Sequence, residues 1–210
     1  MPARKNYLFQ IPRIHDGLQE LLANDPVFSG AGVTPRDIRQ PYYGTGFPGL
    51  VRIVMAQQIS TAAADALWDR LHSRFPRVSP DNILALNADD MRLLGMSHQK
   101  ARAVTDLARA VKSGAFVPEA LDRLPDDKII DRITALRGFG PWSAQIYLMF
   151  GLARPDVWPA DDLGIRQGLQ HYLGVSYRPD PAQARKYGTQ FQPHRTAAAL
   201  LLWHIKSCRA

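Results

Sequence analysis

The sequence LRGFGPWSA, residues 136–144, has the pattern of a tight turn between two helices. Before the turn, Ile129, Ile133 and Leu136 repeat at the spacing of a buried helix face. After it, Pro141 stands where a first helical residue is expected, because that position needs no amide hydrogen. The two glycines between them allow positive φ and leave the turn without a covering side chain. The stretch therefore predicts a helix, a glycine turn and a second helix.

A turn of this kind suits a phosphate group. The first amide groups of a helix have no partner inside the helix, and they bind anions when nothing covers them. The pattern is that of a helix–hairpin–helix element, which grips the DNA backbone without reading bases. A simple corner between two packed helices would have a similar sequence, but the formal net charge of +7 favours a polyanionic partner.

The rest of the chain predicts an all-α protein. Its 210 residues allow one domain or two small lobes. Pro and Gly separate apolar stretches at helical spacing, and no convincing alternating strand appears. We expect about eight to ten helices. Five of them have clear apolar stripes or caps: residues 14–23, 49–57, 98–112, 162–173 and 194–206.

Composition excludes several kinds of site and location. The single cysteine, Cys208, excludes a disulfide framework, a four-cysteine iron–sulfur cluster and a cysteine zinc site. No apolar run approaches the roughly 20 residues of a membrane span, and the N-terminus lacks the apolar core of a secretory signal. We therefore expect no membrane association and an intracellular location, in the cytoplasm with the nucleoid if the source is bacterial.

Two adjacent acids stand at the start of a predicted helix in DVWPADDLGIRQGL, residues 156–169. In one interpretation Asp161 and Asp162 cap that helix, a role that suits Asp161 best. A carboxylate beside a phosphate-binding hairpin adds nothing to DNA affinity, however. It can stabilise an oxocarbenium-like sugar cation and orient or deprotonate an attacking water. The acids therefore suggest cleavage of an N-glycosidic bond.

In their order and spacing these motifs resemble the helix–hairpin–helix DNA glycosylase superfamily, above all its 3-methyladenine DNA glycosylase II group. The likeness spans about residues 45–205 and includes LVRIVMAQQIS (50–60) and HRTAAALLLWHI (194–205). It implies two helical lobes with a DNA-binding cleft between them. Residues 48–155 would form a central lobe with the hairpin. Residues 1–47 and 156–210 would form a second lobe with the catalytic acid.

The resemblance also implies residue roles. Asp162 matches the catalytic aspartate, which stabilises the transition state and orients water. Five residues would contact DNA, with the first near the position that fills the gap left by a flipped base: Gln58, Gly138, Phe139, Gly140 and Ser143. The family often binds a monovalent cation, Na⁺ or K⁺, on hairpin carbonyls, which here would be those of Thr134, Leu136 and Phe139.

One departure from the wider family concerns the reaction itself. Members that also cut the DNA strand carry a lysine in the hairpin, where this chain has Trp142. Tryptophan cannot form the Schiff base that drives strand cleavage. The resemblance therefore implies a monofunctional glycosylase without lyase activity, which leaves an abasic site, and it implies no cofactor or iron–sulfur cluster.

The base would be flipped into an aromatic pocket before its bond is broken. Trp142, on the hairpin helix, is the main candidate, and His194 either stacks on the base or simply starts the last helix. The other candidates, each of which is otherwise a core residue, are Phe47, Tyr147 and Trp158, then Tyr42 and Tyr43. Alkylated purines such as 3-methyladenine and 7-methylguanine suit this pocket because they are cationic, leave readily and stack on aromatic faces.

Other functions fit parts of the same pattern. A related glycosylase for ethenoadenine, uracil or an oxidised base would share every motif. A non-catalytic damage-sensing protein would use the hairpin alone, and a helical interaction module would show no salt-dependent DNA affinity. The expected partner is double-stranded DNA with a damaged base, bound by a monomer. Further candidate phosphate contacts are Arg52, Lys100, Arg102, Arg137 and Arg166.

Overall fold

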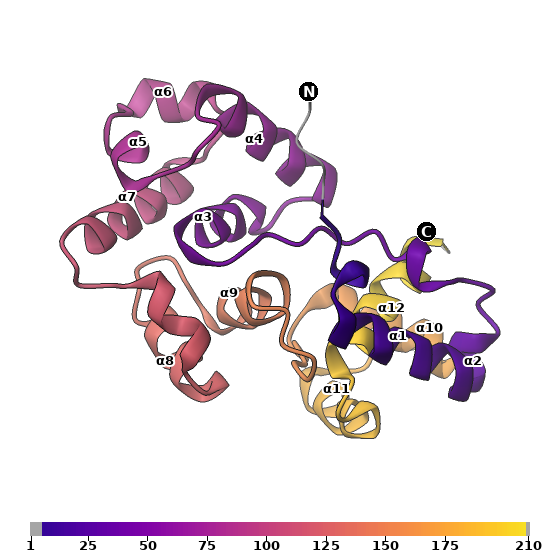
Figure 1. Ribbon diagram of the computed structural model, residues 1–210. Coiled ribbons are helices and arrows are strands. Elements are labelled where there is room, and N and C mark those ends of the chain that lie inside the picture. Colours follow the sequence, from indigo (N-terminus) through magenta and orange to yellow (C-terminus); the bar gives the residue numbers. More distant parts are fainter. Residues whose placement is uncertain (1–5, 209–210) are drawn as a thin grey trace. The chain divides into compact units, whose positions relative to one another are not determined.

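The computed structural model describes residues 6–208 and confirms the all-α expectation. Within that range it contains no strand, and an isolated bridge joins Tyr7 and Pro41. The chain forms two compact units (Figure 1). Unit 1 combines the residues up to Tyr42 with those from Ala153 onward, and unit 2 runs from Tyr43 to Leu152. The boundaries expected from the sequence, at 48 and 155, lie close to these.

Unit 2 carries the predicted hairpin, which is formed by α8 and α9. Its elements are α3 (Gly46–Ala56), α4 (Thr61–Arg74), α5 (Pro80–Leu84), α6 (Ala88–Leu93), α7 (His98–Lys112), η3 (Pro118–Arg123), α8 (Asp126–Thr134), α9 (Pro141–Ile146) and the π-helical turn η4 (Tyr147–Gly151). Helix α4 begins with a side-chain cap, because the Ser60 side chain accepts the Ala63 N–H.

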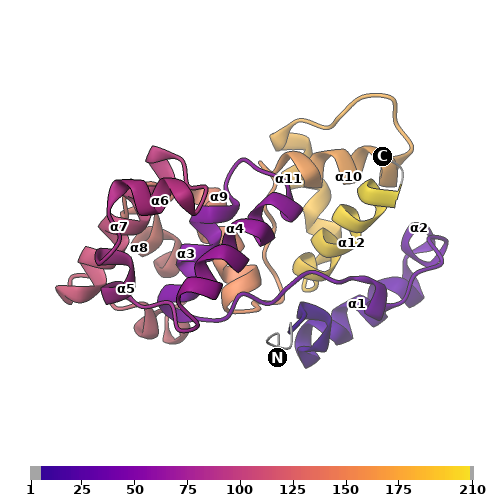
Figure 2. The same cartoon turned by 90° about the horizontal axis from the view of Figure 1, so that it is seen from above.

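The core of unit 2 forms around α3. Leu50, Ile53 and Met55 of this helix have no exposed surface, and α3 contacts α4, α7 and α9. Figure 2 shows α3 beside α4 and α9 within this unit. Burial of such large apolar side chains stabilises the unit by roughly 2 kcal/mol each. The hairpin is therefore attached to a rigid core helix.

Unit 1 carries the predicted acids and is built around its last helix. Its elements are η1 (Leu8–Gln10), α1 (Pro12–Asn24), α2 (Pro26–Ser29), η2 (Pro35–Asp37), α10 (Leu163–Leu173), α11 (Pro181–Gly188), η5 (Thr189–Phe191) and α12 (Arg195–Cys208). Helix α12 contacts both α1 and α10 (Figure 2). Gly168 lets α10 approach α12 closely, because a Cβ at this position would lie 2.5 Å from the Leu202 carbonyl oxygen. Along the described residues, no helix has the length and apolar character needed to cross a membrane.

Candidate functional site

The hairpin in unit 2 has the expected glycine turn. Gly138 has φ +83°, and a Cβ on it would lie 2.6 Å from the Ala103 Cβ, so both the backbone and the packing require glycine. Gly140 differs, because its backbone is extended and a Cβ there would meet nothing within 4 Å. Neither conformation nor packing demands glycine at 140. Its missing side chain leaves the start of α9 open to an external group.

A glutamine from α3's end holds the hairpin in place. The Gln57 Nε2 donates to the Gly138 carbonyl oxygen at 2.9 Å and to the Ser143 Oγ at 2.9 Å. Sequence reasoning missed this role, since the two segments are far apart in the chain. The next residue, Gln58, is exposed and has φ +57°, which is uncommon for a residue other than glycine. The backbone thus presents Gln58 to solvent next to the residue that braces the turn.

Two expected DNA contacts of the hairpin need correction. Ser143 is only 2% exposed, and its hydroxyl is engaged by Gln57. The Phe139 side chain is also buried, and its N–H donates to the Leu136 carbonyl at 3.1 Å. These two side chains stabilise the turn from inside, so the exposed candidates that remain are Gly138, Gly140 and Gln58.

Three aromatic residues expected around the base are instead core residues. Tyr147 has no exposed surface, and its hydroxyl accepts the Gly46 N–H at 3.0 Å. Phe47 is buried. Trp158 is buried against Phe191 and donates its indole N–H to the Ala184 carbonyl at 2.8 Å. Trp142, by contrast, is half-buried in the first turn of α9, so it stays the main candidate.

Most of the basic residues proposed as phosphate contacts also have internal partners. Arg52 pairs with Asp65 at 2.9 Å, and its guanidinium lies 4.4 Å from the centre of the Tyr43 ring. Lys100 donates to the Met55 carbonyl at 2.8 Å, and burial lowers its pKa. Arg137 is exposed but lies 3.9 Å from the Asp106 Oδ2, Arg166 is half-buried and Arg102 is exposed. Arg102 is therefore the best phosphate candidate of this set.

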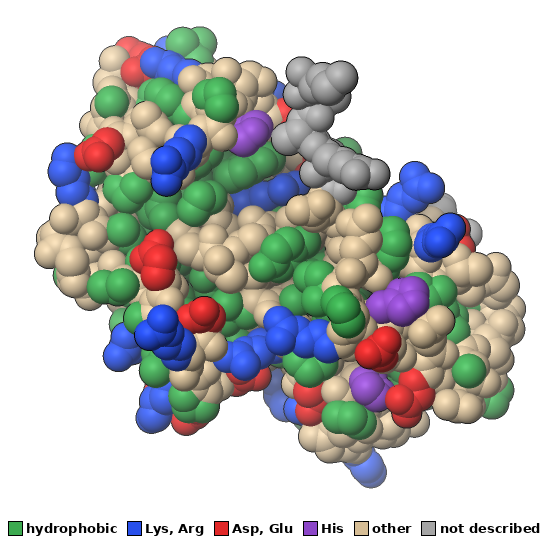
Figure 3. Space-filling model, in the orientation of Figure 1, with side chains coloured by type: hydrophobic (Ala, Val, Ile, Leu, Met, Phe, Trp, Pro, Cys, Tyr) green, Lys and Arg blue, Asp and Glu red, His purple; other side chains and the backbone are tan. Residues whose placement is uncertain are grey.

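Charges near the hairpin are mixed. On the face shown in Figure 3, Lys and Arg side chains over α8 alternate with Asp and Glu. Lys128 of this helix lies within 3.8 Å of both Asp127 and Asp131. Because these charges offset one another, any phosphate affinity here depends on the amides of the turn more than on α8 side chains.

The two adjacent acids in unit 1 have different surroundings. Asp161 is 60% exposed and pairs with Arg185 at 3.1 Å on the surface. Asp162 is half-buried and is the N-cap of α10, its Oδ1 accepting the Ile165 N–H at 2.9 Å. The cap is therefore Asp162, which corrects the expectation that this role belongs to Asp161.

A tryptophan that sequence reasoning did not single out also holds Asp162. The Trp203 Nε1 of α12 donates to the same Asp162 Oδ1 at 2.9 Å. This approach needs a glycine, because a Cβ on Gly164 would lie 2.7 Å from the Trp203 Nε1. The carboxylate is thus oriented by two donors from two helices. Such fixed orientation is what a charge-stabilising carboxylate requires.

His194 is partly buried and lies against α1. Its Nε2 lies 2.9 Å from the Glu20 Oε2, and its ring packs against Gly17 of α1. Its carbonyl accepts the Ala198 N–H at 3.0 Å, as expected for the residue before α12. Of the two roles expected for His194, the structure therefore favours starting the helix over stacking on a base.

The hairpin carbonyl oxygens are candidate ligands for an alkali ion. Thr134 is the last residue of α8 and Leu136 lies two residues beyond it, where carbonyls lose their helical partners; neutral carbonyl oxygens are ligands that K⁺ accepts. The described residues contain no group of three or more His, Cys, Asp or Glu able to hold a metal ion. The ligands that the hairpin offers are therefore neutral carbonyl oxygens, one of which, that of Leu136, also accepts the Phe139 N–H.

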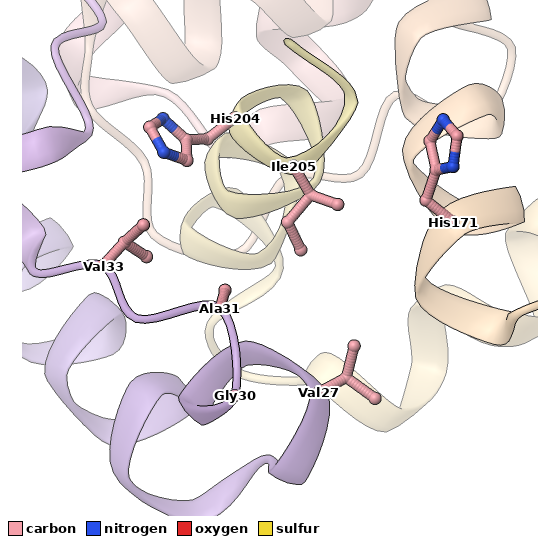
Figure 4. Close-up of a pocket in the computed structure, with 7 residues that line it drawn as sticks. All are labelled: Val27, Gly30, Ala31, Val33, His171, His204 and Ile205. Carbon is pink, nitrogen blue, oxygen red and sulfur yellow. The ribbon is translucent and has the colours of Figure 1, made fainter. Parts of the chain in front are cut away.

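Unit 1 also contains a pocket of about 190 Å³ at its surface (Figure 4). Ile205 of α12 points into it, and apolar side chains of the α2 region form one wall. It is lined by Val27, Gly30, Ala31, Val33, His171, His204 and Ile205. None of the site residues expected from the sequence lines this pocket.

Comparisons with known proteins agree with these features. The family model of the HhH-GPD superfamily base excision DNA repair proteins matches residues 51–193. The DNA-3-methyladenine glycosylase 1 of Schizosaccharomyces pombe is 35% identical over 160 residues, which are 73% of this chain and 69% of that protein. The DNA-3-methyladenine glycosylase 2 of Escherichia coli is 26% identical over 222 residues, covering 98% of this chain and 73% of that protein.

A solved structure supports the same relationship. The 3-methyladenine DNA glycosylase of S. pombe, in complex with abasic DNA, matches with a TM-score of 0.76 and 30% identity. The match covers 90% of this chain and 95% of that one.

Proposed function

Because this chain belongs to the HhH-GPD superfamily of base excision DNA repair proteins, we propose that it is a DNA glycosylase that removes alkylated purines from double-stranded DNA. It hydrolyses the N-glycosidic bond of a methylated purine and leaves an abasic site. The names of its relatives in S. pombe and E. coli support this class of base. The abasic DNA bound by the S. pombe structure supports the proposed product.

The environment of Asp162 carries the proposal. Its Oδ1 is held at 2.9 Å by both the Ile165 N–H and the Trp203 indole. As the bond to the base breaks, positive charge develops on the sugar, and the Asp162 carboxylate stabilises that charge and orients the attacking water. Preorganisation matters because a carboxylate that must be reoriented during the reaction stabilises the transition state less.

The hairpin and its tryptophan bind the DNA backbone and the flipped base. Amides at the open Gly140 end of α9 hold a backbone phosphate, and exposed Gln58 fills the space of the flipped nucleotide. Half-buried Trp142 stacks on the cationic methylated base. A cationic base is a good leaving group, so this site needs no strong general acid. Because Trp142 cannot form a Schiff base, the enzyme does not cut the strand.

A Na⁺ or K⁺ ion forms part of the proposed hairpin. The carbonyls of Thr134, Leu136 and Phe139 would hold it. The ion would add positive charge beside the phosphate. No step of the hydrolysis passes through it.

The proposal is tested by base release from methylated duplex DNA, scored with and without alkali. Wild type should release methylpurine, and strand breaks should appear only after alkali. Asp162→Asn should slow release by at least about a hundredfold. Asp161→Asn is the matched control: its carboxylate is surface-paired with Arg185, and the variant should stay within about twofold of wild type.

Each alternative predicts a different result. If Asp162→Asn releases base as fast as wild type, Asp162 is only a helix cap and the mechanism is wrong. If wild type binds DNA with the salt dependence of phosphate contacts but releases no methylpurine, a different lesion or a damage-sensing role replaces this proposal. Strand breaks without alkali would refute the monofunctional assignment.

A further inference from the structure

The segment that leads to Asp162 is a buried loop. We call residues 154–162 the aspartate loop; Val157, Trp158 and Ala160 within it are all less than 10% exposed. It closes with a turn in which the Asp162 N–H donates to the Pro159 carbonyl at 2.9 Å. Because it has no regular structure, its shape depends on hydrogen bonds to neighbouring elements.

The first residue of α12 grips the start of this loop. The Arg195 Nε donates to the Asp156 Oδ1 at 2.6 Å and its Nη2 to the Asp156 Oδ2 at 2.8 Å. The same Nη2 lies 3.1 Å from the Asp156 carbonyl. A bidentate pair of this kind fixes direction as well as distance.

The next residue, Thr196, makes three hydrogen bonds to the backbone of the loop. Its side chain has no exposed surface. The hydroxyl donates to the Arg154 carbonyl at 2.6 Å and accepts the Val157 N–H at 3.1 Å, while its own N–H donates to the Pro155 carbonyl at 3.0 Å. One hydroxyl therefore bridges the Arg154 carbonyl and the Val157 N–H, three residues apart in the loop.

The same helix holds the other end of the loop. Trp203, which hydrogen-bonds Asp162, follows Thr196 by two helical turns, a rise of about 10 Å. Helix α12 lies against α10 in both views (Figures 1 and 2). The loop is thus fastened to one rigid helix at its start and at its end. A shift at its start would move Asp162 relative to Trp203.

We propose that Thr196 is a positioning residue for the reaction, which acts through the aspartate loop to place the Asp162 carboxylate. This inference rests on the proposed function, in which that carboxylate faces the reacting sugar. Chemistry of this kind is sensitive to displacements below 1 Å. Removing the Thr196 hydroxyl should therefore slow bond cleavage while leaving the hairpin, which belongs to unit 2, able to bind DNA.

A matched pair of variants tests this. Thr196→Val has nearly the same shape but no hydroxyl, and Thr196→Ser retains the hydroxyl. Single-turnover release of methylpurine at saturating enzyme should fall about tenfold in Thr196→Val and stay within about threefold of wild type in Thr196→Ser. The Kd for duplex DNA containing an abasic-site analogue should change less than about twofold in both. A normal rate in Thr196→Val, or equal loss in both variants, would overturn the proposal.

A double variant separates positioning from a general structural role. If Thr196 acts only through Asp162, Thr196→Val should not slow an Asp162→Asn enzyme further. A further loss of the same size would overturn the proposal. Should Thr196→Val fail to unfold cooperatively, Asp156→Asn takes its place, and it should lower the rate severalfold with unchanged Kd. Failure of the proposed function looks different, because then Asp162→Asn itself has no effect.

Discussion

At the scale of the residue, the bond between Trp203 and Asp162 has a measurable consequence. Trp203→Phe keeps an aromatic ring but removes the indole N–H that lies 2.9 Å from the Asp162 Oδ1. The carboxylate then keeps the Ile165 N–H, and its orientation is less well defined. We expect single-turnover base release to fall about tenfold, with DNA affinity unchanged.

Tyr172→Phe is the control for this prediction. Its hydroxyl also donates to a carboxylate in unit 1, the Asp25 Oδ2 at 2.7 Å, outside the candidate site. Removing it should cost about 1–2 kcal/mol of unfolding free energy and leave the release rate unchanged. If Trp203→Phe lost only stability, as Tyr172→Phe should, the orienting role of the indole would be refuted.

At the scale of the element, the two hairpin glycines should respond differently to alanine. Gly138→Ala combines a φ of +83° with a Cβ 2.6 Å from the Ala103 Cβ, and we expect a loss of about 2–4 kcal/mol in unfolding free energy. Gly140→Ala meets no neighbour and has an extended backbone, so stability should change by less than about 1 kcal/mol.

Unlike the free energy of unfolding, DNA affinity should depend strongly on Gly140. A methyl group at 140 covers the amides at the start of α9, so the Kd for an abasic-analogue duplex should rise about tenfold in a fully folded protein. Fluorescence anisotropy and urea unfolding on the same samples measure both quantities. Unchanged affinity in Gly140→Ala would show that phosphate does not approach this end of the helix.

Local signals in the sequence were enough to predict most helices. The stripe and cap signals over 98–112 match α7, and those over 162–173 match α10 to within a residue. The helix predicted after the glycine turn is α-helical only to Ile146, and a π-helical turn follows to Gly151. Apolar spacing does not distinguish these two windings over a few residues.

The candidate site was harder to predict because its contacts join distant segments. Gln57 reaches Gly138 and Trp203 reaches Asp162 across long stretches of chain, and neither pairing leaves a local pattern. Aromatic residues were the least predictable, since Tyr147 and Trp142 stand in one helical stretch yet differ in burial. Burial depends on which elements pack against each face, which one sequence does not specify.

At the scale of the whole molecule, each unit contains a tyrosine that resists ionisation. Burial raises the pKa of Tyr43 in unit 2. Burial, followed by the hydrogen bond to Asp25, raises the pKa of Tyr172 in unit 1. Lys100 has the opposite effect on the pH dependence of stability. Burial lowers its pKa, so the folded protein loses the Lys100 proton at a lower pH than the unfolded chain does.

These tyrosines predict a loss of stability in alkaline solution. Above the ordinary tyrosine pKa of 10.0, the unfolded chain loses protons that the folded protein keeps, so unfolding becomes easier as pH rises. Each tyrosine contributes a slope of at most about 1.4 kcal/mol per pH unit, and Lys100 opposes this slope over its own range below 10.5.

Urea unfolding of wild type and of the double variant Tyr43→Phe/Tyr172→Phe between about pH 8 and 11.5 measures this pH dependence. The double variant should lose stability less steeply above about pH 10 and run parallel to wild type below about pH 9. Parallel curves throughout would mean that both hydroxyls ionise as easily in the folded protein as in the unfolded chain.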